Sequence, residues 1–179
     1  MSKRWTMAAC ALVCLFAGCA SHEPALSTVS VPDNLKPGAN EALQRILHAQ
    51  GVQIYECRAT AGQPAAYQWA FVAPEADLFD ARGKNVGRHY AGPHWEATDA
   101  SKIVGTVKER ADAPEADAIP WLLLTAKSVG RRGAFSEVTS IQRVNTAGGV
   151  APKVGCSQTA AGTQARVDYT ADYYFFTTR

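Results

Sequence analysis

The chain has 179 residues, with 18 basic and 16 acidic side chains and a net charge of only +2. We find no basic run or patch, so nucleic acid is excluded as an expected partner. The length suits one domain with one sizeable core, and no internal repeat or low-complexity segment divides the chain.

The first 18 residues are predicted to be a signal peptide. Lys3 and Arg4 precede the uncharged, apolar run WTMAACALVCLF at 5–16. That run is shorter than the roughly 20 residues that a membrane-spanning helix needs, and it has the length of a signal-peptide core. Removal of 1–18 would leave 16 basic against 16 acidic residues, so the expected mature net charge is near zero.

The motif FAGC at 16–19 is similar to the bacterial lipobox, in which the cysteine is lipidated and becomes the first mature residue. The usual leucine stands one place early, at Leu15. Cleavage nearby by an ordinary signal peptidase and an uncleaved anchor are the alternatives. Lipidation of Cys19 predicts that the protein contacts the membrane through its lipid anchor only. Ala20 and Ser21 follow the cysteine, so no aspartate stands directly after it. By resemblance to bacterial lipoprotein sorting rules, this favours the periplasmic face of the outer membrane.

The five cysteines divide into two groups under this interpretation. Cys10 and Cys14 lie within the predicted signal peptide, and Cys19 is the predicted lipidation site. Cys57 and Cys156 remain in an oxidising compartment, so a single disulfide between them is predicted. Two unpaired or metal-binding thiols are the alternative, which the lack of a CxxC pair or a nearby histidine disfavours.

Residues 19–36 are predicted to form the lipidated cysteine and a flexible tether. The stretch 20–37, ASHEPALSTVSVPDNLKP, contains three prolines and several small polar residues. A single β-rich domain is then expected over 37–179.

One short N-terminal helix is predicted from Gly38 to Gly51. Asn40 can cap its start, and its last glycine suits the left-handed residue that follows a helix. Leu43, Ile46 and Leu47 recur at the spacing of one helical face.

The rest of the chain consists of apparent strands separated by turns. In 165–177, apolar and polar residues alternate, and only Tyr174 and Phe176 interrupt the polar face, as if something covers it there. We expect an all-β fold, mainly an antiparallel sandwich or a partly closed barrel. The segments that carry β-type patterns are 52–58, 67–73, 86–91, 94–98, 101–110, 121–130 (a strand or a short helix), 133–149 and 165–177.

Five motifs, GVQIYEC, HYAGPHWE, PWLLL, IQRVNTAGG and YTADYYF, carry a family resemblance. They resemble the bacterial and fungal secreted proteins grouped as domain of unknown function 3455, over roughly residues 32–177. The resemblance implies an extracytoplasmic location, but the family has no established activity or catalytic residues to transfer. Pro93 and Trp95 fit its pattern, whereas His94 stands where a small residue such as threonine is expected.

The stretch HYAGPHWEATDAS at 89–101 concentrates the candidate chemistry. A small hydrolase or other enzyme would pair His89 with Glu96 or Asp99 as a general acid and base. Its nucleophile would be Ser101 or a serine from elsewhere, Ser128 or Ser136, although no GxSxG elbow is present.

A metal site in this stretch would use His89, His94 and Glu96, with Asp99 as a further ligand. The spacing matches no familiar zinc signature such as HExxH, so we expect no metal and no cofactor.

A structural corner is the hypothesis we favour for 89–101. Gly92 and Pro93 would turn the chain, Trp95 would be buried, and Asp99 and Ser101 would form a turn through hydrogen bonds to the backbone. Such a corner can still border a binding pocket.

Binding candidates are Trp95, Arg143 and Asn145, the last two beside the turn NTAGG. The predicted role is therefore non-catalytic binding of a small ligand, a glycan or an envelope protein. A purely structural envelope or stress protein is the remaining alternative. Several aromatic residues could form a sugar-stacking surface or belong to the core: Tyr55, Trp69, Tyr90, Trp95 and Trp121.

Overall fold

The computed structural model describes residues 28–179, so the predicted signal peptide and Cys19 lie outside the described residues. None of the described residues belongs to a helix long and apolar enough to span a bilayer. The elements in chain order are η1 (Asp33–Leu35), β1 (Glu41–Thr60), β2 (Gln63–Phe79), β3 (Asn85–Tyr90), β4 (His94–Ala97), β5 (Lys102–Ala111), β6 (Trp121–Ser128), β7 (Val138–Gly148), η2 (Gln158–Ala160) and β8 (Gln164–Thr178).

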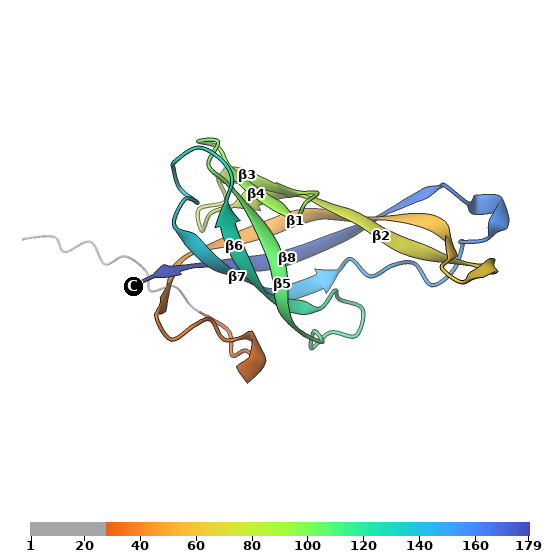
Figure 1. The fold of residues 1–179 in the computed structure, drawn as a ribbon, viewed down its shortest axis with the longest axis horizontal. Helices are drawn as coiled ribbons and strands as arrows, with labels where there is room; N and C mark the ends of the chain where they lie inside the picture. The colour runs from red at the N-terminus through yellow and green to blue at the C-terminus, as the bar shows by residue number, and fades with distance from the viewer. Residues whose placement is uncertain (1–27) are drawn as a thin grey trace, which may run out of the picture.

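The eight strands form one antiparallel sheet that closes on itself. Each strand pairs with the next one along the chain, and β1 also pairs with β8. Figure 1 shows the shorter strands β3 to β6 curling round to meet β7 and β8. The predicted all-β, antiparallel class is confirmed, and the sheet forms a closed ring.

The ring has an incomplete wall because its strands differ in length. β3 pairs with β2 only over Ala76–Phe79, and β4 pairs with β5 only over His94–Glu96. Within the described chain, the rest of β2 and of β5 therefore pairs on one side only. The β1–β2 hairpin extends as an arm well beyond the shorter strands (Figure 1). An opening is left between β2 and β5.

The helix predicted from Gly38 to Gly51 is wrong, because most of this segment forms the first half of β1. Gly51 lies within the strand, where a Cβ atom would overlap the backbone of Glu75 and Ala76 on β2. This glycine therefore serves the close approach of two strands and does not end a helix.

A β-bulge explains the misleading helical spacing. The register of β1 against β8 shifts between Leu43 and Arg45, which inserts one extra residue into β1. Leu43 and Ile46 consequently face the same outer side, where they pack into the cluster that contains Tyr174 and Phe176. Leu47, one residue further on, faces the interior.

The interior of the ring is an apolar and aromatic core. Alternate residues of β8 point inward, as the alternation predicts, and meet inward residues of the other strands. Burial of this set supplies the main hydrophobic stabilisation of the fold. The buried members are Leu47, Ala49, Ala76, Leu78, Trp95, Ala97, Ile103, Ile119, Leu124, Phe135, Val138, Ile141, Tyr169, Ala171, Tyr173 and Phe175.

A second cluster covers the outer face of β8, where Tyr174 and Phe176 interrupt the polar alternation. The cover is the N-terminal segment: Leu35 is fully buried there, and Val29 and Val31 pack against the cluster. Gln142 Nε2 also donates a hydrogen bond to the Leu35 carbonyl at 2.6 Å. The predicted tether, which ended at residue 36, is therefore too long, because an apolar segment within it packs on the domain.

Cys57 and Cys156 form the predicted disulfide, with their Cα atoms 5.3 Å apart. The bond holds the loop between β7 and β8 against the arm. Trp69 adds a second link, because its Nε1 donates to the carbonyl of Val154 at 2.9 Å.

Candidate functional site

A cavity of about 380 Å³ lies where the wall opens between β2 and β5. Phe71, Val72 and Val107 are exposed large apolar residues at its rim. The volume falls in the range of small-molecule pockets, which combine apolar walls with few polar groups. Its lining consists of Gln53, Phe71, Val72, Pro74, His89, Gly92, Pro93, Trp95, Val107, Leu122, Leu124, Arg143 and Tyr173.

Strand register places the polar lining residues in neighbouring pairs. His89 on β3 lies opposite Trp95 on β4, and Arg143 on β7 lies opposite Tyr173 on β8. Directly opposed residues of an antiparallel pair share one face of the sheet. The inward direction of each aromatic ring therefore also directs His89 and Arg143 toward the interior.

The turn between β3 and β4 is the structural corner that the sequence predicts, and it borders the cavity. Gly92, with a φ of 136°, and Pro93 form the turn and line the cavity wall. Trp95 is 1% exposed and stacks on His89, with ring centroids 4.2 Å apart.

His89 is buried and uncharged at neutral pH. Its Nδ1 lies 2.8 Å from the carbonyl oxygen of His94. Because a carbonyl only accepts, Nδ1 is the donor and Nε2 is the unprotonated nitrogen. Burial lowers the pKa of His89 to about 3, and the nearby Arg143 charge acts in the same direction. An imidazole of this kind does not gain a proton near neutral pH.

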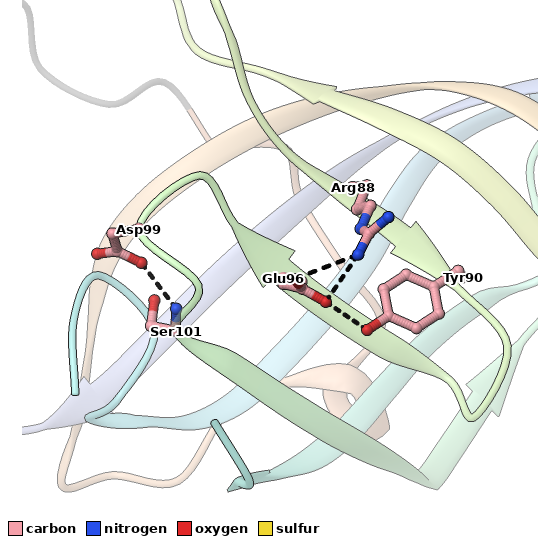
Figure 2. A network of polar contacts seen from close by, with 5 residues as sticks. All are labelled: Arg88, Tyr90, Glu96, Asp99 and Ser101. Carbon is pink, nitrogen blue, oxygen red and sulfur yellow. Dashed lines mark hydrogen bonds and ion pairs between the residues drawn. The ribbon is translucent and has the colours of Figure 1, made fainter. Parts of the chain in front are cut away.

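Glu96 lies on the opposite side of the sheet from His89. It forms an ion pair with Arg88 at 3.2 Å and accepts a hydrogen bond from the Tyr90 hydroxyl (Figure 2). These two contacts, with that from Tyr90 the larger, lower the pKa of Glu96. The structure therefore does not bring His89 and Glu96 together as an acid–base pair.

Asp99 and Ser101 are engaged in the turn before β5, as predicted. Asp99 accepts hydrogen bonds from the backbone N–H of Ser101 at 2.9 Å, drawn in Figure 2, and of Ala134 at 2.8 Å. Hydrogen bonds from Ser101 and Ala134 lower the pKa of Asp99 to about 2. Ser101 is fully buried, and its Oγ accepts from the Phe135 N–H at 3.0 Å. Neither side chain faces the cavity lining.

The residues of the metal hypothesis are also separated. His94 places its Nδ1 2.6 Å from the Ala91 carbonyl and stacks on Tyr90, on the side of the sheet away from His89. Across residues 28–179, no three or more His, Cys, Asp or Glu side chains gather in a group that could hold a metal ion.

Of the three binding candidates, Trp95 and Arg143 line the cavity and Asn145 does not. Asn145 lies at the bulge in β7 with a φ of 49°, and its Nδ2 donates to Asp172 at 2.7 Å. Arg143 donates through Nε and Nη2 to the Pro120 carbonyl, at 3.1 and 2.8 Å. No carboxylate of the described residues lies within 4.0 Å of it.

The aromatic residues do not gather into one stacking surface. Trp95 belongs to the interior, Trp121 to the outer cluster, and Trp69 to the arm. Tyr55 is buried and donates to the Gly149 carbonyl, whereas Tyr90 lies outside with Glu96. These five aromatic residues therefore offer no common face on which a sugar could stack.

Three residues of the cavity lining each have one fully buried polar atom without a hydrogen-bond partner in the described part of the chain. These atoms are Nε2 of Gln53, Nε1 of Trp95 and the hydroxyl of Tyr173. Their side chains are 2%, 1% and 1% exposed. A buried polar group that stays unpaired costs roughly 1–3 kcal/mol, so proteins retain few of them without a role.

Gln53 and Tyr173 are polar residues of the cavity lining that the candidate set lacks. Gln53 points inward like Ala49 and Tyr55, because alternate residues of β1 share one face of the sheet. The sequence shows this direction once 38–51 is taken as part of the same strand. Tyr173 stands on the predicted apolar face of 165–177, but alternation alone does not distinguish a pocket hydroxyl from a core ring.

The comparisons with known proteins identify the family and nothing finer. The model of the family described as protein of unknown function (DUF3455) matches residues 37–177, so the chain belongs to this family. No curated protein and no solved structure matches the chain.

Proposed function

We propose that this DUF3455 protein binds a small amphipathic molecule in the cavity between β2 and β5, without chemistry of its own. The observation that carries the proposal is a cavity of about 380 Å³ with mostly apolar walls and a few polar side chains in its lining, among them His89 and Arg143. A ligand with an apolar body and a polar head would cover the apolar walls and meet the polar side chains of the lining. Eight-stranded closed sheets can hold one small ligand in this way.

The arrangement supports binding better than catalysis. His89 is a buried, neutral imidazole, and the carboxylates of Glu96 and Asp99 lie away from it. A general acid and base must both reach the same substrate atoms, which these three residues do not do.

A calorimetric titration with 1-octanol tests the pocket. We expect one molecule to bind per protein, and Val107→Trp to abolish this binding, because the larger side chain would fill the mouth of the cavity. Val107 is 53% exposed, so its replacement should leave the fold intact.

Val129→Trp is the matched control, because Val129 is 47% exposed and does not line the cavity. It should bind octanol like the wild type. If octanol does not bind the wild type, or binds both variants equally well, the cavity is not the binding site.

We further propose that the domain is anchored in the bacterial envelope through lipid on Cys19, on the periplasmic face of the outer membrane. The lipobox-like FAGC supports this proposal, as does a packed domain that begins about ten residues after the cysteine. Cells grown with a labelled fatty acid should yield labelled wild-type protein and unlabelled Cys19→Ser protein. Unlabelled wild-type protein would contradict the anchor.

A further inference from the structure

We infer that the ligand of this cavity is an organic carboxylate with an apolar body, and that Arg143 receives its carboxylate. The inference rests on the proposed binding function and names the chemical class of the ligand. It derives from the position of the Arg143 guanidinium in the cavity lining and from the lack of a carboxylate beside it among the described residues.

Arg143 is a cation in the cavity lining that pairs with no carboxylate of the described residues. Within residues 28–179 it donates from Nε and Nη2 to the single carbonyl of Pro120, and it lies close enough to the Tyr173 hydroxyl to lower the pKa of that phenol against the larger effect of burial. A guanidinium has five N–H groups, so three of them are left for another partner. The contact with Pro120 holds the Nε–Nη2 edge of the planar guanidinium, and Nη1 lies on its other edge. A partly buried charge is stable when a counter-charge pairs with it, and no described carboxylate does so.

The unpaired polar atoms around the cavity are hydrogen-bond donors. Gln53 Nε2 and Trp95 Nε1 can only donate, and the Tyr173 hydroxyl can donate. These atoms are fully buried, so Arg143 is the charged donor of the lining that a ligand meets, and its N–H groups call for a head group that accepts hydrogen bonds. Tyr173 is also the direct cross-strand neighbour of Arg143, so these two donors lie side by side.

The other groups that face Arg143 supply no negative charge. His89 is neutral, with its Nδ1–H on the His94 carbonyl. Burial raises the pKa of Tyr55, Tyr169 and Tyr173, so these phenols keep their protons. The cavity therefore carries one positive charge, which a single negative charge balances.

A carboxylate fits these observations better than a phosphate. The planar guanidinium fork pairs with two carboxylate oxygens, and one monoanion neutralises the one cation. A phosphate monoester near neutral pH carries more charge than Arg143 can balance, inside walls made of Phe71, Leu122 and Leu124.

The test compares head groups on one eight-carbon chain by calorimetry, with octanoate, 1-octanol, octylamine and octyl phosphate as the probes. The wild type should bind octanoate about 10- to 100-fold more tightly than octanol, because hydrogen bonds to a charged group are the stronger ones. Octyl phosphate should bind less tightly than octanoate, and octylamine should bind least.

Arg143→Gln should remove the preference for octanoate over octanol. Urea unfolding of this variant should show a cooperative transition like that of the wild type, which checks that it still folds. Arg143→Lys, which retains charge without the planar fork, should retain part of the preference.

The outcomes separate this inference from the proposed function. If octanol binds and Val107→Trp blocks it, but octanoate has no advantage, the pocket stands and the carboxylate assignment falls. A preference that survives in Arg143→Gln, or tighter binding of octyl phosphate, would also overturn the assignment.

Discussion

Trp95→Ala is expected to lower the free energy of unfolding by about 3–5 kcal/mol, the usual cost of removing a buried tryptophan. The ring is 1% exposed. It stacks on His89 at 4.2 Å and meets Tyr173 edge to face at 5.3 Å. Gly105 on β5 makes room for it, because a Cβ there would lie 2.7 Å from the indole ring. Removal of the indole would leave a void that these neighbours cannot fill without moving.

Urea unfolding of the oxidised protein measures this loss, and Trp69→Ala is its control. Trp69 lies on the arm, where it is only partly buried and its indole nitrogen bonds to Val154. We expect a loss of about 1 kcal/mol from that change, the typical value of one hydrogen bond. Equal losses in the two variants would show that Trp95 is not the anchor of the corner.

The corner at 89–101 is the part of the site that the sequence predicts well. Gly92-Pro93 imposes a turn, and Asp99 and Ser101 form local hydrogen bonds, all within a few residues of one another. Turns and hydrogen bonds of this kind can be predicted from the sequence because their residues are close along the chain.

The spacing of apolar residues misleads where a β-bulge changes that spacing within a strand. The bulge after Leu43 gives β1 a spacing of three between Leu43 and Ile46, which is also the spacing of one helical face. Only the partner strand β8 distinguishes the two interpretations, because both residues pack beside Tyr174 and Phe176. The interruption of the polar alternation at those two residues did predict a cover, but not that the cover is the N-terminal segment.

The pocket itself could not be predicted from the sequence, because it forms where two strand pairings, β2 with β3 and β4 with β5, end. β3 leaves β2 at Ala76, and β4 leaves β5 near Val104. Arg143 and Tyr173 lie opposite each other on the paired strands β7 and β8, and only the pairing of β8 with β1, which closes the ring, brings Gln53 to them. The separation of His89 from Glu96 likewise depends on strand parity, which places residues 89 and 96 on opposite faces.

Acid is expected to destabilise the protein through His89, over the window from about pH 6.5 to about pH 3. Burial lowers the folded-state pKa of this imidazole to about 3, against an ordinary value of 6.5. Between these values the unfolded chain binds a proton that the folded chain does not, so stability falls as the pH falls. The slope approaches 1.4 kcal/mol per pH unit, and the loss across the window is roughly 4 kcal/mol.

His89→Gln isolates this contribution, because glutamine can still donate a hydrogen bond to the His94 carbonyl but does not titrate. Urea unfolding at a series of pH values should show a shallower loss of stability in His89→Gln than in the wild type above pH 4. The control, Val129→Gln, changes no titratable group at a position that is 47% exposed, so it should keep the wild-type slope. The same slope in wild type and His89→Gln would mean that the folded protein protonates His89 near its ordinary pKa.

The cause of this depressed pKa also links stability to the pocket. His89 faces the stacked indole of Trp95, the ring of Tyr173 and the charge of Arg143. Within residues 28–179 no carboxylate lies close enough to Arg143 to offset that charge. A bound carboxylate beside Arg143 would supply the missing negative charge, and an adjacent negative charge raises the pKa of an imidazole. Saturating octanoate should therefore make the loss of stability between pH 6.5 and pH 5 smaller, whereas octanol, which brings no charge, should leave it unchanged.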